Sequence, residues 1–488
     1  MTFGLEQHII DKIISVFEAN TKVDKAYVFG SRAKGNYRPD SDIDIAIKGI
    51  DITLDDILKM SVAFEDKGIK NKIDLIDYTS IKEPALQEHI DRVGIEFYSR
   101  WKERILAEMG TLQRGKSKHR PRYAFHLYGG PYPFIQTGQI REASKYITKY
   151  EQTYSEDGLT QSKLWKKGTL CITIAANIAE IAILGMDACF PDSVLGFIPN
   201  KKKCDLDFAF YTLKYFQKEL QQMGDGSVQD NINLGTFKQI KFPFPPLPEQ
   251  SVIASILSNL DDKIDLLHRQ NKILEQLAET IFRQWFVEEA EDSWEEISLS
   301  RIAEHSKENI HPSENPSKVY KHYSLPSFDN GKEPVIETGK EILSNKYKVV
   351  SNSILVSKLN PRTPRIWMLH GDINEDECIC STEFQVVIPK EDKWFGFIYC
   401  FLQLSSVTQE LAGASSGTSG SHQRINPQDI FNLILLKPTP HKVDEFNEIT
   451  NKFWTKIQKN QTQIRTLIQT RDTLLPKLMS GEVRVQMQ

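Results

Sequence analysis

The sequence predicts a multidomain α/β protein: a small α/β domain followed by two α+β domains, each ending in a long coiled-coil helix. Its 488 residues exceed what one hydrophobic core usually serves, so several domains are expected. The last third of the chain repeats the middle at an offset of 193 residues, and both copies contain apolar residues at heptad spacing. The predicted domains are residues 1–100, 101–247, 248–293, 294–440 and 441–488.

Composition excludes few function classes. No run of 18 apolar residues exists, so no membrane span is predicted. The six cysteines form no CxxC pair, which is typical of a reduced, cytoplasmic protein, and Cys378 and Cys380 are more typical of inert strand residues than of metal ligands. Residues 101–247 hold 20 lysines and arginines against 14 acids. Only one long segment is thus basic, so composition alone does not establish DNA binding.

The first 100 residues alternate between helical and strand patterns. Apolar side chains recur at helical spacing over residues 5–20, and residues 54–67 also predict a helix. Strands are predicted at "KAYVFG", "DIDIAI" and "KIDLIDY", and "EHIDRVGIEFYS" closes the unit. These segments predict one small α/β domain.

This domain contains a pattern typical of nucleotide chemistry. Asp42 and Asp44 lie two residues apart on a strand, so their carboxylates share a face and repel each other unless a cation such as Mg²⁺ lies between them. Gly30 allows close backbone approach to a phosphate, the Ser31 hydroxyl can bind one, and Asp74 supplies a third carboxylate. A DxD pair alone is also typical of a solvated strand end. The whole pattern predicts a metal-bound nucleoside triphosphate positioned for in-line attack.

Residues 5–100 resemble the minimal nucleotidyltransferase domains of the DNA polymerase β superfamily. The resemblance rests on "GSRAKGNYRPDSDIDIAI", "KIDLIDY" and "RVGIEFY". It implies that Gly30 and Ser31 hold the triphosphate, and that Asp42, Asp44 and Asp74 bind Mg²⁺ as catalytic residues. Known relatives include antitoxins that transfer AMP to a partner toxin, which implies a protein acceptor of AMP. The alternative is a folded domain kept only for docking.

The repeat joins two similar segments and two similar helices. "INLGTFKQIKFPFPP" begins at Ile232 and "INPQDIFNLILLKPT" at Ile425, with Pro245 matching Pro438. The first predicted seam is Ile253, Leu257, Leu260, Ile264, Leu267, Asn271, Leu274, Ala278, Ile281 and Trp285. The second is Phe453, Ile457, Asn460, Ile464, Leu467, Arg471, Leu474 and Leu478. We expect the polar residues Asn271, Asn460 and Arg471 to fix the register of the helices; the alternative is that they face solvent.

A mixed segment of strands and one helix precedes each long helix. In the first copy we expect strands at "TLCITIA" and "IAEIAIL", and a helix at "DFAFYTLKYFQKELQQM". In the second copy we expect strands at "NSILVSKL" and "TEFQVVIP", and a helix at "WFGFIYCFLQLSSVTQEL". Each helix runs into a Gly/Ser loop. The pattern predicts a molecule with two similar heads.

Residues 101–488 resemble the specificity subunits of type I restriction-modification systems. The resemblance rests on "LQRGKSKHRPRYAFHLYGGPYPFIQTGQI", on "GSVQDNINLGTFKQIKFPFPPLPEQ" and on the repeat; the second copy diverges and lacks "PxEQ". It implies two target-recognition domains on antiparallel conserved helices and a bipartite target in double-stranded DNA. The implied partners are methyltransferase subunits and a restriction/translocase subunit. This part shows neither a methyltransferase signature nor a Walker P-loop, so it is expected to need no cofactor.

Basic loops are the candidate DNA contacts, because lysines position DNA through phosphates and arginines often read guanine edges. The alternative is that these loops are simply solvated. The candidates are Lys116, Lys118, His119, Arg120 and Arg122, then Lys201, Lys202 and Lys203, in the first copy, and Lys358, Arg362, Arg365, His422, Gln423 and Arg424 in the second.

Two functions follow from these patterns. The main hypothesis is a type I specificity subunit that directs methylation and restriction by partner subunits, with an appended nucleotidyltransferase-like domain. The alternative is a nucleotidyltransferase that a DNA-binding C-terminal region targets. A fusion without functional coupling is a third interpretation. Whether the chain is an enzyme depends on its first 100 residues.

Overall fold

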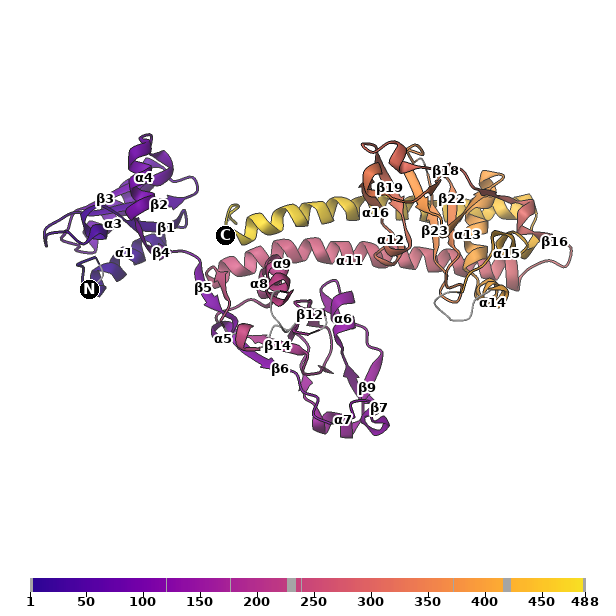
Figure 1. The fold of residues 1–488 in the computed structure, drawn as a ribbon, viewed down its shortest axis with the longest axis horizontal. Helices are drawn as coiled ribbons and strands as arrows, with labels where there is room; N and C mark the ends of the chain where they lie inside the picture. The colour runs from indigo at the N-terminus through magenta and orange to yellow at the C-terminus, as the bar shows by residue number, and fades with distance from the viewer. Residues whose placement is uncertain are drawn as a thin grey trace. The chain divides into compact units, whose positions relative to one another are not determined.

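A computed structural model describes residues 3–119, 121–175, 177–225, 234–237, 239–371, 373–415 and 423–485. The chain divides into two compact units. Figure 1 shows the helices and strands that form them. The first comprises Met1–Asn259 together with Arg471–Gln488, and the second comprises Leu260–Thr470. Two long helices, α11 and α16, each contribute to both units.

The N-terminal domain is a four-stranded sheet with helices. Its elements are α1 (Gln7–Ala19), β1 (Val23–Val28), α2 (Gly30–Lys34), β2 (Ile43–Gly49), α3 (Leu54–Asp66), β3 (Ile73–Asp77), η1 (Tyr78–Ser80), α4 (Pro84–Val93) and β4 (Ile95–Ser99). The strand order is β3-β2-β1-β4, with β2 and β3 parallel and the other pairs antiparallel. Apolar residues of α1, α3 and the sheet form the core, in which Phe17 meets Phe64 edge to face. The predicted α/β domain is confirmed.

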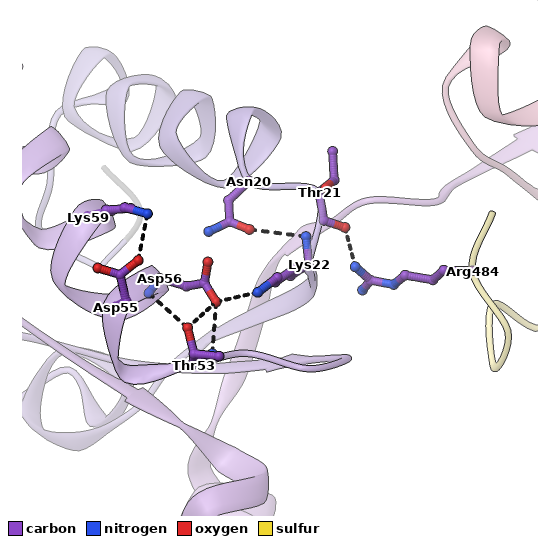
Figure 2. A network of polar contacts seen from close by, with 8 residues as sticks. All are labelled: Asn20, Thr21, Lys22, Thr53, Asp55, Asp56, Lys59 and Arg484. Carbon is purple, nitrogen blue, oxygen red and sulfur yellow. Dashed lines mark hydrogen bonds and ion pairs between the residues drawn. The ribbon is translucent and has the colours of Figure 1, made fainter. Parts of the chain in front are cut away.

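The loop at residues 20–22 is tied on two sides (Figure 2). Thr53 and Asp56 form a capping box at the start of α3, and Lys22 Nζ lies 2.6 Å from the Asp56 carboxylate. The hydrogen bonds from Lys22 and Thr53 hold the pKa of Asp56 well below its usual range. On the other side, Arg484 donates to the carbonyl oxygen of Thr21. The loop therefore links α3 to the C-terminal segment.

A buried ion pair follows the N-terminal domain. The Arg100 guanidinium lies 2.9 Å from the Glu249 carboxylate, and both side chains are less than 10% exposed. Arg100 also donates to the Thr21 carbonyl at 2.7 Å. Glu249 lies in the first turn of α11 (Leu247–Arg283), so one arginine ties the N-terminal domain to the first long helix.

The first mixed segment forms three small sheets. Its strands are β5 (Lys102–Ile105), β6 (Gly110–Arg114), β7 (Tyr128–Phe134), β8 (Tyr146–Ile147), β9 (Gln152–Tyr154), β10 (Leu164–Trp165), β11 (Leu170–Thr173), β12 (Ile181–Leu184), β13 (Ala188–Cys189), β14 (Val194–Pro199) and β15 (Lys241–Phe244). Its helices are α5 (Leu106–Met109), η2 (Phe125–Leu127), α6 (Thr137–Glu142), α7 (Glu156–Gln161), α8 (Leu206–Tyr215), α9 (Gln217–Asp225) and α10 (Leu234–Phe237). The sheet orders are β6-β14-β11-β12-β8, β10-β13-β7-β9 and β15-β5.

The second mixed segment repeats this design. Its strands are β16 (Glu295–Ser298), β17 (Ala303–Ser306), β18 (Asn309–Ile310), β19 (Val319–Tyr323), β20 (Val335–Thr338), β21 (Lys346–Lys348), β22 (Ser353–Ser357), β23 (Ile366–Leu369), β24 (Cys378–Ser381), β25 (Phe384–Pro389) and β26 (Ile434–Lys437). Its helices are η3 (Gln284–Glu288), η4 (Leu299–Arg301), η5 (Pro312–Glu314), α12 (Leu325–Asp329), η6 (Gly339–Glu341), η7 (Asp392–Trp394), α13 (Phe395–Gln403), α14 (Ser405–Ala414), α15 (Pro427–Phe431) and α16 (Pro440–Met479). The sheet orders are β17-β25-β22-β23, β18-β21-β24-β19-β20 and β16-β26.

The two copies correspond element by element. β5 and β16, β6 and β17, β15 and β26, and α11 and α16 each begin 193 residues apart, which is the offset found in the sequence. In both copies the first strand pairs with the strand that precedes the long helix. The internal repeat is therefore a repeat of structure.

The long helices are antiparallel. Within the second unit, Phe282 of α11 contacts Phe446 of α16, Asn271 pairs with Asn460, and Ile264 packs with Ile464. Positions that rise along one helix therefore meet positions that fall along the other. With 37 and 40 residues, the helices are about 55 and 60 Å long.

The predicted seam holds for most of its length and then shifts. On α11 it is correct as far as Ala278, which is fully buried. Beyond that point Phe282 and Phe286 are buried, whereas the predicted Ile281 and Trp285 are only partly buried. An α-helix of 3.6 residues per turn drifts against a strict heptad, so the buried stripe moves by one position.

The predicted helices of the two mixed segments are each divided in two. The first is interrupted at Phe216, between α8 and α9. The second is interrupted at Leu404, whose backbone is extended with φ −60° and ψ 138°. Extended backbone cannot continue the helical hydrogen-bond pattern, so a new helix begins at Ser405. Throughout the described ranges, no helix is both long and apolar enough to span a membrane.

Asn271 and Asn460 form a hydrogen bond of 2.8 Å inside the helix pair, where Asn460 is only 1% exposed. We expect Asn271→Ala to lower the free energy of unfolding by about 1–3 kcal/mol, because the buried amide of Asn460 loses its shorter hydrogen bond and keeps only the one of 3.4 Å to Gln270. Urea unfolding followed by circular dichroism measures the change.

The double variant Asn271→Leu with Asn460→Leu is the control, because it removes both polar groups together. We expect it to regain most of the lost stability. A single variant that is as stable as the unmodified protein would show that the pair contributes nothing.

Candidate functional site

Three carboxylates meet at one end of the N-terminal sheet. Asp44 on β2 lies beside Asp74 on the parallel strand β3, and Asp42 comes directly before β2. The Ile43 N–H donates to the Lys72 carbonyl at 2.8 Å, which fixes the register of this strand pair. The predicted residues Asp42, Asp44 and Asp74 therefore share one site.

The turn after β1 lies against this site. Gly30 has φ +68°, which favours glycine, and a Cβ atom there would collide with the Asp44 carboxylate. The preceding amide, that of Phe29, donates to the Asp44 carbonyl at 3.0 Å. Ser31 follows within the first turn of α2. The structure thus places the predicted Gly30 against the Asp44 carboxylate, with Ser31 as the next residue of the chain.

Arg32 is a buried residue that holds the backbone of this site, and it was not among the predicted site residues. Its side chain is 2% exposed and donates to the carbonyl oxygens of Phe3, Ser41 and Asp42. These bonds fix the loop that leads into the two aspartates. An arginine in a polar Gly/Ser motif gives no pattern that would distinguish it from a solvated charge.

The carboxylates interact strongly with one another. Burial raises the pKa of Asp44, and the neighbouring charges of Asp74 and Asp42 raise it further. Lys72 partly compensates, because its ammonium lies 2.7 Å from Asp74 and 3.9 Å from Asp42. The site therefore has an excess of negative charge that favours a cation.

The donor set fits Mg²⁺ in its chemistry, since carboxylate oxygens are the ligands that this ion prefers. The positions of the three carboxylates do not yet match those of metal ligands. The described residues contain no group of three or more His, Cys, Asp or Glu side chains that could hold a metal ion as they stand. Lys72 joins two of the three predicted ligands. Movement of Lys72 would free Asp74 for such a role.

In the first mixed segment, the loop after β6 holds the first predicted DNA contacts. Lys118 is exposed, Lys116 is half-buried, and Arg122 lies 3.1 Å from Asp192. Arg120 lies outside the described residues. His119 contacts the ring of His126 edge to face, at 5.0 Å between centroids.

The structure does not bring the two basic loops of this segment together. β6 and β14 are antiparallel, with Arg114 opposite Leu195 and Gly110 opposite Pro199. The loop after β6 therefore leaves one end of the strand pair, and Lys201, Lys202 and Lys203 follow the other end.

In the second mixed segment, the two predicted stretches do meet. Leu359 and Arg424 form a β-bridge, and the Asn360 N–H donates to the Gln423 carbonyl at 3.0 Å. Within them, Lys358 donates to the Thr382 carbonyl at 2.6 Å, and burial lowers its pKa. His422 lies outside the described residues.

Two arginines of this segment are held by acids. Arg365 makes two hydrogen bonds to Asp329, and Arg424 lies 2.9 Å from Glu383. Of the predicted lysine and arginine contacts in the described part of the chain, seven form no ion pair: Lys116, Lys118, Lys201, Lys202, Lys203, Lys358 and Arg362.

Two aromatic residues of the first basic loop, Tyr123 and Phe125, were not among the predicted contacts. Tyr123 is 86% exposed and Phe125 is 95% exposed. The available signal was the placement of both aromatics within a run of basic residues, which is a common feature of nucleic-acid contacts.

Replacement of Asp44 tests the electrostatics of the carboxylate site. A raised pKa means that the folded state favours the protonated form, so stability falls as the pH rises through that pKa. We expect Asp44→Asn to be more stable than the unmodified protein at pH 7 without divalent metal, and the gain to shrink towards about pH 4. Thermal unfolding at the two pH values measures this.

Asp66→Asn, at the exposed end of α3, is the matched control and should change little at either pH. An Asp44→Asn variant that is less stable than the unmodified protein at pH 7 would contradict the expectation.

Comparison with known proteins agrees with both parts of this organisation. Residues 98–276 match a family model described as the type I restriction modification DNA specificity domain. Residues 11–103 match the model described as polymerase beta, nucleotidyltransferase.

Individual relatives support the same division. The MjaIX specificity subunit of a type I restriction enzyme from Methanocaldococcus jannaschii is 25% identical over 420 residues, which cover 79% of this chain and 94% of that protein. A type I restriction-modification S subunit from M. genitalium has a solved structure with a TM-score of 0.50 and 17% identity, covering 80% of this chain and 97% of that one, so it shares the fold. Most of this chain is therefore similar to type I restriction-modification specificity subunits, and residues 11–103 match a nucleotidyltransferase domain of the polymerase β type.

Proposed function

We propose that this chain selects a bipartite DNA target for a type I restriction-modification complex. The observation that carries the proposal is the structural repeat, in which equivalent elements begin 193 residues apart and end in antiparallel helices. A repeat of this kind presents two similar reading surfaces to one duplex. Residues 101–247 and 294–440 are the proposed target-recognition domains, and residues 248–293 and 441–488 are the proposed spacers.

The helices suit the role of a spacer. Helices of about 55–60 Å exceed the roughly 34 Å of one DNA turn, so the two halves of the target can lie more than one turn apart. The register of the helices then fixes the gap between the half-sites. The paired asparagines on the seam, Asn271 and Asn460, support a defined register.

Partner subunits are part of the proposal. Three predicted DNA contacts, Arg122, Arg365 and Arg424, are already paired with acids, so these arginines offer less charge to phosphates than their number suggests. Methyltransferase subunits would supply both methylation and further DNA affinity, and a restriction/translocase subunit would supply cleavage. The long helices are the proposed surface for the methyltransferase subunits.

Sequencing of methylated bases in the source cell tests this function. We expect a bipartite methylated motif that disappears when the gene is deleted and returns when it is restored. Exchange of residues 294–440 for those of another specificity subunit should change one half of the motif only. A methylation pattern that is unchanged by the deletion would overturn the proposal.

A second activity is proposed for the N-terminal domain, because the polymerase β-type match coincides with the grouped carboxylates. Gly30 and Ser31 would hold the triphosphate of a nucleotide, and Asp42 and Asp44, with Asp74 once released from Lys72, would hold Mg²⁺. Bound there, Mg²⁺ would neutralise the phosphates and orient them for nucleotidyl transfer. The acceptor we propose is a protein that receives AMP.

Two glycines offer a matched test of this activity. Gly30 and Gly35 both have positive φ, but only at Gly30 would a Cβ strike the Asp44 carboxylate; at Gly35 nothing lies within 4 Å. We expect Gly30→Ala to abolish binding of Mg²⁺-ATP in calorimetry and labelling of partner proteins by radioactive ATP. Gly35→Ala should keep both, with about 1–2 kcal/mol of lost stability. Equal binding by the two variants would contradict the proposed site.

A further inference from the structure

Tyr123 and Phe125 lie near the end of the loop between β6 and β7, and they are among the most exposed aromatic residues of the described chain. Their exposed fractions are 86% and 95%. Single exposed apolar residues are common on protein surfaces. Two aromatic residues that are almost fully exposed and only one residue apart are unusual and call for an explanation.

The backbone around these residues is fixed. Tyr128 donates its hydroxyl to the Arg122 carbonyl at 3.0 Å, which holds the chain directly before Tyr123. Ser155 donates its hydroxyl to the His126 carbonyl at 2.6 Å, which holds the chain directly after Phe125. The two aromatic rings are thus presented from a segment that is anchored on both sides, at little cost in conformational entropy on binding.

Phe125 is not exposed because a hydrophobic core is missing nearby. Leu127, two residues after Phe125, is 2% exposed and packs with Phe134, Tyr154 and Cys189. The same short stretch therefore enters a hydrophobic cluster while Phe125 points into solvent. Burial of a phenylalanine side chain normally stabilises a fold, and this conformation forgoes that contribution.

The sequence that leads to the two rings is basic. Lys118 is exposed, and Arg122, next to Tyr123, is 47% exposed although it is paired with Asp192. Exposed aromatic residues that follow such a basic run are the combination that binds nucleic acids, since the cations meet phosphates while the rings stack on bases or enter a base step. A methyltransferase surface is the other candidate occupant, but nothing in this loop favours it over DNA.

We propose that Tyr123 and Phe125 form an aromatic wedge, with Phe125 stacking on the bases of one unstacked step in the half-site read by residues 101–247. This inference rests on the proposed DNA-reading function and deepens it. The wedge would contribute to target choice through the ease with which that step unstacks, in addition to any hydrogen bonds to base edges.

The test uses the full chain assembled with its methyltransferase subunits, and a duplex that carries the methylated motif of the source cell. We expect Phe125→Ala to weaken binding about ten-fold or more, because stacking on a base is lost. The slope of log affinity against log salt should stay the same, because no charge is removed. Lys118→Ala should instead reduce that slope by about one.

A second measurement reports the wedge directly. With 2-aminopurine placed in turn along the half-site, one position should brighten when the unmodified complex binds, and this signal should be lost in Phe125→Ala. Phe125→Trp should restore both the signal and the affinity. Leu54→Ala, at a 72% exposed apolar residue of α3, is the matched control and should resemble the unmodified protein.

The possible outcomes distinguish failure of the aromatic wedge from failure of the DNA-reading function. If the unmodified complex binds the motif while Phe125→Ala shows the same affinity and the same fluorescence, the wedge alone is overturned. If Phe125→Ala fails to assemble with the methyltransferase subunits but keeps its DNA signal, the surface belongs to the partner protein, and the wedge is again overturned. A complex that shows no preference for the motif would overturn the DNA-reading function and the wedge together.

Discussion

The antiparallel packing of α11 and α16 is the constraint on which the two-headed organisation depends. Each helix follows one copy of the repeated segment, and both copies join their helix through a strand that pairs with their first strand. Each copy is therefore attached to the helix pair in the same way. Its core is almost entirely apolar, and an apolar seam alone tolerates sliding. The hydrogen bond from the buried Asn460 amide to the half-buried Asn271 restricts that freedom, because sliding of the helices would separate the two side chains.

The repeat, the seam and the carboxylate site could be predicted because each depends on local periodicity. An offset of 193 residues survives in the sequence, and carboxylates two residues apart on a strand must share a face. The shift of the seam to Phe282 and Phe286 could not be predicted, since a strict heptad does not include the drift of a real helix.

Ion pairs and hydrogen bonds between residues far apart in the chain could not be predicted from the sequence either. Arg365 and Arg424 resemble free DNA contacts in the sequence, yet Asp329 and Glu383, both distant along the chain, hold them. Arg32 looks like a surface charge in the sequence but is buried beside the carboxylate site. In each case the partner is a carboxylate or a carbonyl group that only the fold brings near. Phe125 shows the opposite difference: an apolar aromatic residue that would be expected in a core is exposed to solvent.

The buried pair of Arg100 and Glu249 bears on how such a fusion could arise and persist. Glu249 opens the first long helix, and its counterion comes from the last residue of the N-terminal domain. Arg100 and Arg484 both donate to the Thr21 carbonyl. Loss of the N-terminal domain would therefore leave a carboxylate without its counterion at the base of the spacer, where charges are expensive to bury. The pair therefore stabilises the fused chain, so selection for a stable specificity subunit would favour retention of the N-terminal domain.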